Sequence, residues 1–165
     1  MGGRIGFQLI KYNPSRFNSY IIGGLSPFPR QSAAEQNTMN QTTKALRVGA
    51  EKGPEAVVVF LENLRGQKLP SELRQRFLNN DYIALYVLRQ KTLTWSLTGD
   101  RVSKISAPCL LYVGDQDPCH DGVKEAATRI PQASFVSLYG LNHARTRDSH
   151  QIIPHVKKFL SRVAI

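Results

Sequence analysis

The chain has 165 residues, of which 41% are hydrophobic and 8% aromatic, so it can bury one core and is not a disordered polymer. No stretch approaches the roughly 20 apolar residues that a membrane span needs. The first residues lack the apolar run and the small-residue cleavage site of a signal peptide. These features indicate a cytoplasmic protein without a membrane partner.

The charge is uneven, with 22 basic and 12 acidic residues and a net charge of +10. Such a charge raises the question of a nucleic-acid partner. However, the longest basic tract is the pair Lys157-Lys158, and no nucleic-acid-binding motif is present. We therefore expect no nucleic-acid partner. The first acidic residue is Glu35, a distribution typical of a chain that lacks an acidic half.

The two cysteines do not form a disulfide or zinc pattern. Cys109 lies in an apolar run and Cys119 follows ten residues later in a polar loop. We expect two reduced thiols, no metal and no cofactor. Cys119 could be a nucleophile, but nothing nearby in the sequence would activate it, so a packing role is favoured.

The first predicted element is a short amphipathic helix over residues 3–12. Gly3 and Gly6 would allow a neighbouring segment to approach it closely, and Asn13-Pro14 ends the pattern. Its expected apolar face consists of Ile5, Leu9 and Tyr12.

A strand follows at Tyr20–Ile22, which is apolar on all sides and ends in Gly23-Gly24, as is typical of a buried parallel strand. Residues 31–103 then form a polar, helical insertion. Its apolar residues recur at spacings of three and four, so each short helix has one face to bury. The aromatic residues among them are expected to pack, with a substrate-pocket wall as the alternative. The breaks between helices fall at Gly53-Pro54, at Gly66 with Pro70, and at Asn79-Asn80-Asp81.

The C-terminal third alternates between strands and helices. The run Cys109–Val113 predicts a strand, residues 123–129 a helix, and residues 134–138 a second strand. This order predicts an α/β fold with a parallel sheet and covering helices. A final helix is predicted by the stripe Ile152, Ile153, Val156, Phe159, Leu160 and Val163.

Two loops leave the carboxyl ends of these strands, where open α/β sheets build their sites. One contains Asp117 and the other ends in His143. An aspartate in a turn or a lone histidine is by itself more often structural. Together, at neighbouring strand ends, they predict a catalytic base and its orienting carboxylate. The remaining candidates are assigned to loops and helix ends: Asp115, Asp121, His120, His150 and His155.

This arrangement resembles the α/β-hydrolase family, whose chain order is nucleophile, acid, histidine. The start, Met1-Gly2-Gly3, is similar to the end of a GxSxG elbow that reads Ser-Met-Gly-Gly, with Gly2 as its last glycine. By this resemblance, Asp117 in Gly114-Asp115-Gln116-Asp117 is the acid, His143 is the base, and the backbone N–H of Met1 is an oxyanion donor.

The resemblance implies the C-terminal part of such a fold. Residues 1–30 would be the helix and strand after the elbow, 31–103 a helical cap or lid, and 104–165 the C-terminal core with the acid and histidine loops. The implied function is serine-esterase-like hydrolysis of an ester or related small acyl substrate. Serine is the favoured nucleophile, with aspartate or cysteine as alternatives.

The nucleophile itself is not found in the sequence. Three other serines lie on or beside strands without an elbow turn, so they are not expected to replace it: Ser19, Ser26 and Ser137. The expectation is therefore a truncated, inactive form of a hydrolase that could self-associate through an exposed strand. The alternative is a non-catalytic derivative that binds a small ligand or a protein.

Overall fold

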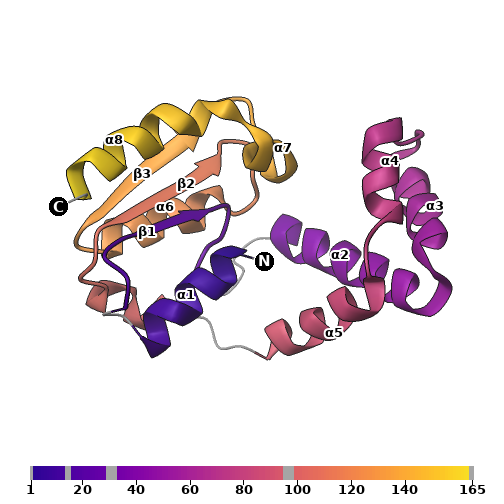
Figure 1. The fold of residues 1–165 in the computed structure, drawn as a ribbon, viewed down its shortest axis with the longest axis horizontal. Helices are drawn as coiled ribbons and strands as arrows, with labels where there is room; N and C mark the ends of the chain where they lie inside the picture. The colour runs from indigo at the N-terminus through magenta and orange to yellow at the C-terminus, as the bar shows by residue number, and fades with distance from the viewer. Residues whose placement is uncertain (1, 14–15, 29–32, 95–98, 164–165) are drawn as a thin grey trace. The chain divides into compact units, whose positions relative to one another are not determined.

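The computed structural model describes residues 2–13, 16–28, 33–94 and 99–163. They belong to two units: unit 1 comprises residues 1–35 and 97–165, and unit 2 comprises residues 36–96 (Figure 1). None of the helices in these described ranges combines the length and the apolar character of a transmembrane span.

Unit 1 is built on a parallel sheet with the strand order β1-β2-β3. The strands are β1 (Tyr20–Gly23), β2 (Cys109–Gly114) and β3 (Ala133–Leu138). The first residues of the three strands are in register, since Cys109 pairs with Tyr20 on one side and with Ala133 on the other. All three carboxyl ends therefore lie at one edge of the sheet (Figure 1). The predicted α/β class with a parallel sheet is confirmed.

The core of unit 1 lies between one face of the sheet and two helices. Helix α1 (Gly2–Tyr12) contacts β1, and α6 (His120–Arg129) contacts β2 and β3. Every second strand residue points to this side, as the pleat requires. The buried cluster consists of Phe7, Ile10, Tyr20, Ile22, Phe28, Val102, Ile105, Cys109, Leu111, Val113, Val123, Ala126 and Ile130.

Helix α1 buries a different face from the one predicted. Its buried side chains are Phe7 and Ile10, and Gly3 and Gly6 lie on the same face because they are one turn away. A Cβ at either glycine would lie within 3.3 Å of the Ile22 side chain, so the glycines let the helix backbone approach β1 closely. The predicted apolar face was wrong, because the close approach of the helix backbone to β1 decides which side of the helix is buried. The residues of the predicted face are exposed by 43%, 39% and 75%: Ile5, Leu9 and Tyr12.

Strand β1 is buried on one face only, which also differs from the prediction. Tyr20 and Ile22 are buried against the helices, whereas Ile21 is 39% exposed. On the same side as Ile21, the ring of Tyr112 lies over Gly23, where any larger residue would collide with it. The all-apolar pattern therefore does not mean burial on both sides here.

The chain ends in three short helices where one was predicted. Helix α7 (His143–Asp148) is followed by the 3-10 turn η3 (His150–Ile152) and by α8 (Ile153–Val163). In α8, Phe159 is buried, but Ile153 and Leu160 of the predicted stripe are exposed. A further 3-10 turn, η2 (Gly99–Lys104), precedes β2. Helix α6 begins at His120, three residues before the predicted start.

Unit 2 contains most of α2 (Ala33–Lys52) together with α3 (Pro54–Arg65), α4 (Ser71–Leu78) and α5 (Tyr82–Leu93). Helices α2, α3 and α4 end at the three predicted breaks. The buried Glu62 accepts hydrogen bonds from the Lys68 ammonium at 2.7 Å and from the Leu69 backbone N–H at 3.2 Å, which holds the segment before α4. A small core consists of Ala45, Val57 and Tyr82, with Leu46, Phe60, Leu61 and Leu85 packed against it.

Gly114 is the last residue of β2 and lies in close contact with the segment that follows β3. A substitution at Gly114 therefore tests this packing at the carboxyl edge of the sheet. A Cβ there would collide with the Leu141 carbonyl and lie 2.7 Å from the Thr146 hydroxyl. We expect Gly114→Ala to lower the free energy of unfolding by about 1–3 kcal/mol, measured by urea denaturation. The control is Gly2→Ala in α1, where a Cβ would meet nothing within 4 Å. Equal stability of the two variants would contradict this packing.

Candidate active site

The loop after β2 presents Asp117 at the carboxyl edge of the sheet. The Asp117 backbone N–H donates to the Gly114 carbonyl at 3.1 Å, which forms a tight turn. The Asp117 carbonyl in turn accepts from the His120 N–H at 2.9 Å, at the start of α6. The aspartate is therefore fixed between the end of a buried strand and the beginning of a helix.

The Asp117 carboxylate is buried and hydrogen-bonded on both oxygens. Its side chain is 1% exposed. Oδ1 accepts from the Cys119 backbone N–H at 2.9 Å, and Oδ2 lies 2.8 Å from Nδ1 of His143. A buried carboxylate is costly unless such donors replace water. These two contacts make it a fixed acceptor that holds the imidazole in one orientation.

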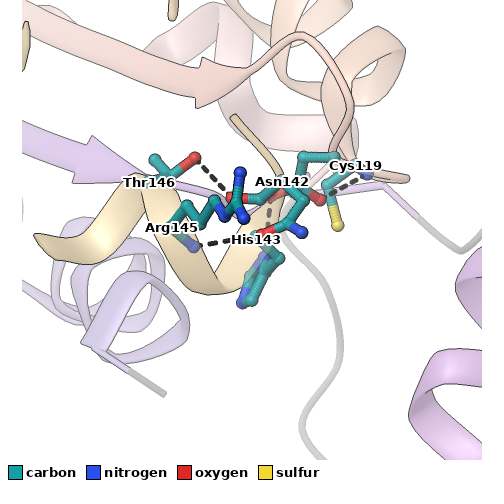
Figure 2. A network of polar contacts seen from close by, with 6 residues as sticks. Cys119, Asn142, His143, Arg145 and Thr146 are labelled. Carbon is teal, nitrogen blue, oxygen red and sulfur yellow. Dashed lines mark hydrogen bonds and ion pairs between the residues drawn. The ribbon is translucent and has the colours of Figure 1, made fainter. Parts of the chain in front are cut away.

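His143 is the first residue of α7, a position that Asn142 defines. The Asn142 side chain caps the helix by accepting from the Arg145 N–H at 3.1 Å. The backbone carbonyl of Asn142 accepts from the Thr146 hydroxyl at 2.9 Å, so both the side chain and the backbone of Asn142 hold this turn (Figure 2). His143 is 63% exposed, and its ring therefore meets Asp117 on one side and is open on another.

The loops after β2 and β3 are bound to each other. The Asp115 N–H donates to the Leu138 carbonyl and the Gln116 N–H to the Leu141 carbonyl, each at 3.0 Å. The end of β1 joins them at Gly24, whose φ of +62° favours glycine. A Cβ at Gly24 would lie 3.3 Å from the His143 ring and 3.6 Å from the Asp117 carboxylate. All three strand ends therefore converge on the pair.

The electrostatics of the pair favour a charged imidazole. The hydrogen bond to Asp117 raises the pKa of His143 above its ordinary value of 6.5, and the attraction of the carboxylate adds to this effect. Partial burial and the charge of Arg147 lower the pKa, but by less. With Nδ1 held by Asp117, the ring has Nε2 available for proton transfer, the arrangement a general base needs.

The structure brings together Asp117 and His143 and leaves the other candidates apart from them. His120 contacts Asp121 and Ser137 instead, while Asp115, His150 and His155 are exposed. The proposed oxyanion donor, Met1, lies outside the described residues. Four contributors were not predicted from the sequence: Gly24, the Cys119 backbone N–H, Asn142 and Thr146. Of these, Asn142 could have been found, because asparagine is a favoured helix cap.

The cysteines were predicted to be reduced thiols. Neither Cys109 nor Cys119 forms a disulfide. Burial raises the pKa of the Cys109 thiol to about 11, so this thiol is unreactive. Within the described ranges, no group of three or more histidine, cysteine, aspartate or glutamate side chains is placed to hold a metal ion.

Solved structures similar to this chain are α/β-hydrolases. An esterase from Thermogutta terrifontis has a TM-score of 0.74 at 17% identity, over 98% of this chain and 62% of the esterase. MenH from S. aureus has a TM-score of 0.77 at 19% identity, over 99% of this chain and 66% of MenH. An enol-lactonase from Burkholderia xenovorans LB400 has a TM-score of 0.70 at 18% identity, over 98% and 63%. No family model and no curated protein sequence matches the chain.

The chain therefore has the α/β-hydrolase fold, as the sequence predicted, and corresponds to a C-terminal portion of it. It spans less than two thirds of the length of the esterase and of MenH. At these identities, the likeness shows the fold alone.

The raised pKa of His143 can be measured by following its ring signals in an NMR titration. We expect a value above 6.5 in the wild-type chain and a lower one in Asp117→Asn, because the hydrogen bond to the carboxylate is its largest cause. Because folding raises the pKa of His143, its contact with Asp117 contributes to the stability of the fold. This stabilisation is fully present at pH values below the pKa of His143 in the unfolded chain, and it is lost as the pH rises through the pKa in the folded chain.

The matched control for this titration is Asp115→Asn, which changes an exposed carboxylate in the same loop. It should leave the His143 titration unchanged. An unshifted His143 in the wild-type chain, or the same shift in Asp117→Asn, would show that the pair is not formed in solution.

Proposed function

We propose that Asp117 and His143 are the acid and the base of a hydrolase triad that acts on an ester or related small acyl substrate. The observation that carries the proposal is the 2.8 Å contact between the buried Asp117 carboxylate and Nδ1 of His143 at the carboxyl edge of the sheet. The fold supports it, since two proteins with similar structures are described as an esterase and an enol-lactonase.

The proposed chemistry assigns one task to each residue. Nε2 of His143 accepts the proton of a nucleophilic hydroxyl as its oxygen attacks the carbonyl carbon, and then donates that proton to the leaving group. Asp117 accepts from Nδ1, which fixes the tautomer and stabilises the imidazolium. The raised pKa of His143 is consistent with a base that gains a proton during the reaction.

The packing of α1 supports a place for the nucleophile at the amino-terminal end of this helix. A Cβ at Gly3 would lie 2.9 Å from Cβ of Leu25, and one at Gly24 would lie 3.3 Å from the His143 ring. The amino-terminal end of α1 and His143 therefore contact the same short segment. A serine joined directly before Met1 would lie next to this end, where the helix dipole favours the negative charge of an oxyanion. Serine is favoured because Gly2 and Gly3 match the end of the elbow motif.

We also propose that the helical insertion between β1 and β2 is the cap insertion of a hydrolase and helps to determine which substrate is accepted. The two strands pair directly, yet the chain forms helices α2 to α5 between them. The insertion follows the carboxyl end of β1, and α/β sheets bind ligands at the edge formed by the carboxyl ends of their strands. Its role in choosing the substrate can be tested by exchanging it for the insertion of another hydrolase.

Hydrolysis of an aryl ester tests the triad. The enzyme is a polypeptide in which a strand and a Gly-x-Ser turn are joined before α1, and its turnover is compared with that of the 165-residue chain. We expect the longer chain to turn over the ester. His143→Ala should reduce its kcat by about 10⁴-fold and Asp117→Asn by about 10³-fold or more, because each removes a member of the proton-transfer chain.

The control in this assay is Asp115→Asn, which changes a neighbouring exposed carboxylate and should stay near the parent rate. The 165-residue chain should show no turnover that depends on His143. The proposal fails if His143→Ala in the longer chain retains more than about a tenth of the activity, since a general base contributes at least about 100-fold.

A further inference from the structure

A second group of serine, histidine and aspartate lies outside the site described above. Nε2 of His120 lies 3.0 Å from the Ser137 hydroxyl oxygen, and its Nδ1 lies 3.1 Å from an Asp121 carboxylate oxygen. His120 and Asp121 begin α6, and Ser137 lies in β3, two elements that pack together (Figure 1). The fold therefore gives one imidazole both a serine hydroxyl and a carboxylate as neighbours, the arrangement that activates a serine nucleophile.

The His120 ring is held in this orientation by more than its polar contacts. It packs edge-on against Phe135, with the ring centroids 5.7 Å apart and an angle of 73° between the planes. Phe135 is partly buried and packs against the core of unit 1, so it is a firm support. The His120 side chain is 24% exposed, whereas Ser137 is exposed and open to an electrophile.

We propose that Ser137 is an activated nucleophile that accepts an acyl group from activated esters, with His120 as its general base. In the tautomer with the proton on Nδ1, Asp121 accepts from that N–H and Nε2 accepts from the serine. The Ser137 oxygen bonds to the carbonyl carbon while its proton passes to Nε2. The bond from that carbon to the leaving oxygen then breaks, the alcohol or phenol leaves as its anion, and His120 releases the proton to solvent.

This group differs from the Asp117–His143 pair in a way that limits its substrates. The Asp121 side chain is 99% exposed, so its attraction to the ring is screened by water, whereas Asp117 is buried. Ser137 also lies in a regular strand and not at the amino end of a helix. We therefore expect reaction with esters that have good leaving groups. The inference does not depend on the proposed function, because it involves none of the same side chains.

The test uses p-nitrophenyl acetate on the 165-residue chain, with the acetylated residues located by mass spectrometry. Cleavage after Arg129 and Arg145 gives one tryptic peptide that contains both Ser134 and Ser137. Ser134 is an internal control, since it is an exposed serine of the same strand. We expect Ser137 to be acetylated about 100-fold faster than Ser134, the gain typical of a positioned general base.

Variants separate activation from simple exposure. His120→Gln should slow acetylation of Ser137 to the rate of Ser134, whereas His155→Gln, which changes an exposed histidine of α8, should leave it unchanged. Asp121→Asn should slow it by a few-fold, and Asp121→Glu should restore it.

Equal acetylation of Ser137 and Ser134 in the wild-type chain would overturn the proposal without any variant, so the result does not depend on whether His120→Gln folds. A folded His120→Gln chain that keeps the fast rate, shown by an unchanged circular dichroism spectrum, would also overturn it. Failure of the proposed His143 triad would be seen separately, as ester turnover of the longer polypeptide that persists in His143→Ala, without any change at Ser137.

Discussion

The hydrogen bond between His143 and Asp117 depends on three elements of unit 1: β1, β2 and α7. The carboxylate is held at the end of β2, the imidazole at the start of α7, and Gly24 at the end of β1 lies against both. Because the strands are parallel and in register, their carboxyl ends meet at one edge of the sheet. A contact of 2.8 Å between residues 26 positions apart is therefore a consequence of the sheet topology.

The burial of Asp117 strengthens its interaction with His143. A carboxylate that is shielded from water interacts more strongly with a neighbouring charge, provided that its oxygens are hydrogen-bonded. Asp117 meets this condition through the Cys119 N–H and His143. The pair of His120 and Asp121 has similar distances, but its carboxylate is exposed. The two histidines thus share a geometry and differ in the environment of their partners.

The sequence predicted the features that depend on chain order and local pattern. It predicted the parallel sheet, the breaks between the helices of the insertion, and Asp117 and His143 as neighbours. It did not predict which face of α1 is buried, because Gly3 and Gly6 let the backbone approach Ile22 and this outweighs the pattern of large side chains. It also missed α7, because this helix has only six residues and depends on the Asn142 cap. It missed the contact of His120 with Ser137 as well, because that contact needs the tertiary structure.

The assignment of Asp117 and His143 can be tested by a crystal structure of a longer polypeptide, in which a Gly-x-Ser turn directly precedes Met1. We expect the oxygen of this serine to lie about 2.6–3.2 Å from Nε2 of His143, while Asp117 still accepts from Nδ1. A serine oxygen beyond the reach of Nε2, or an imidazole turned away from Asp117, would contradict the assignment of these two residues as base and acid.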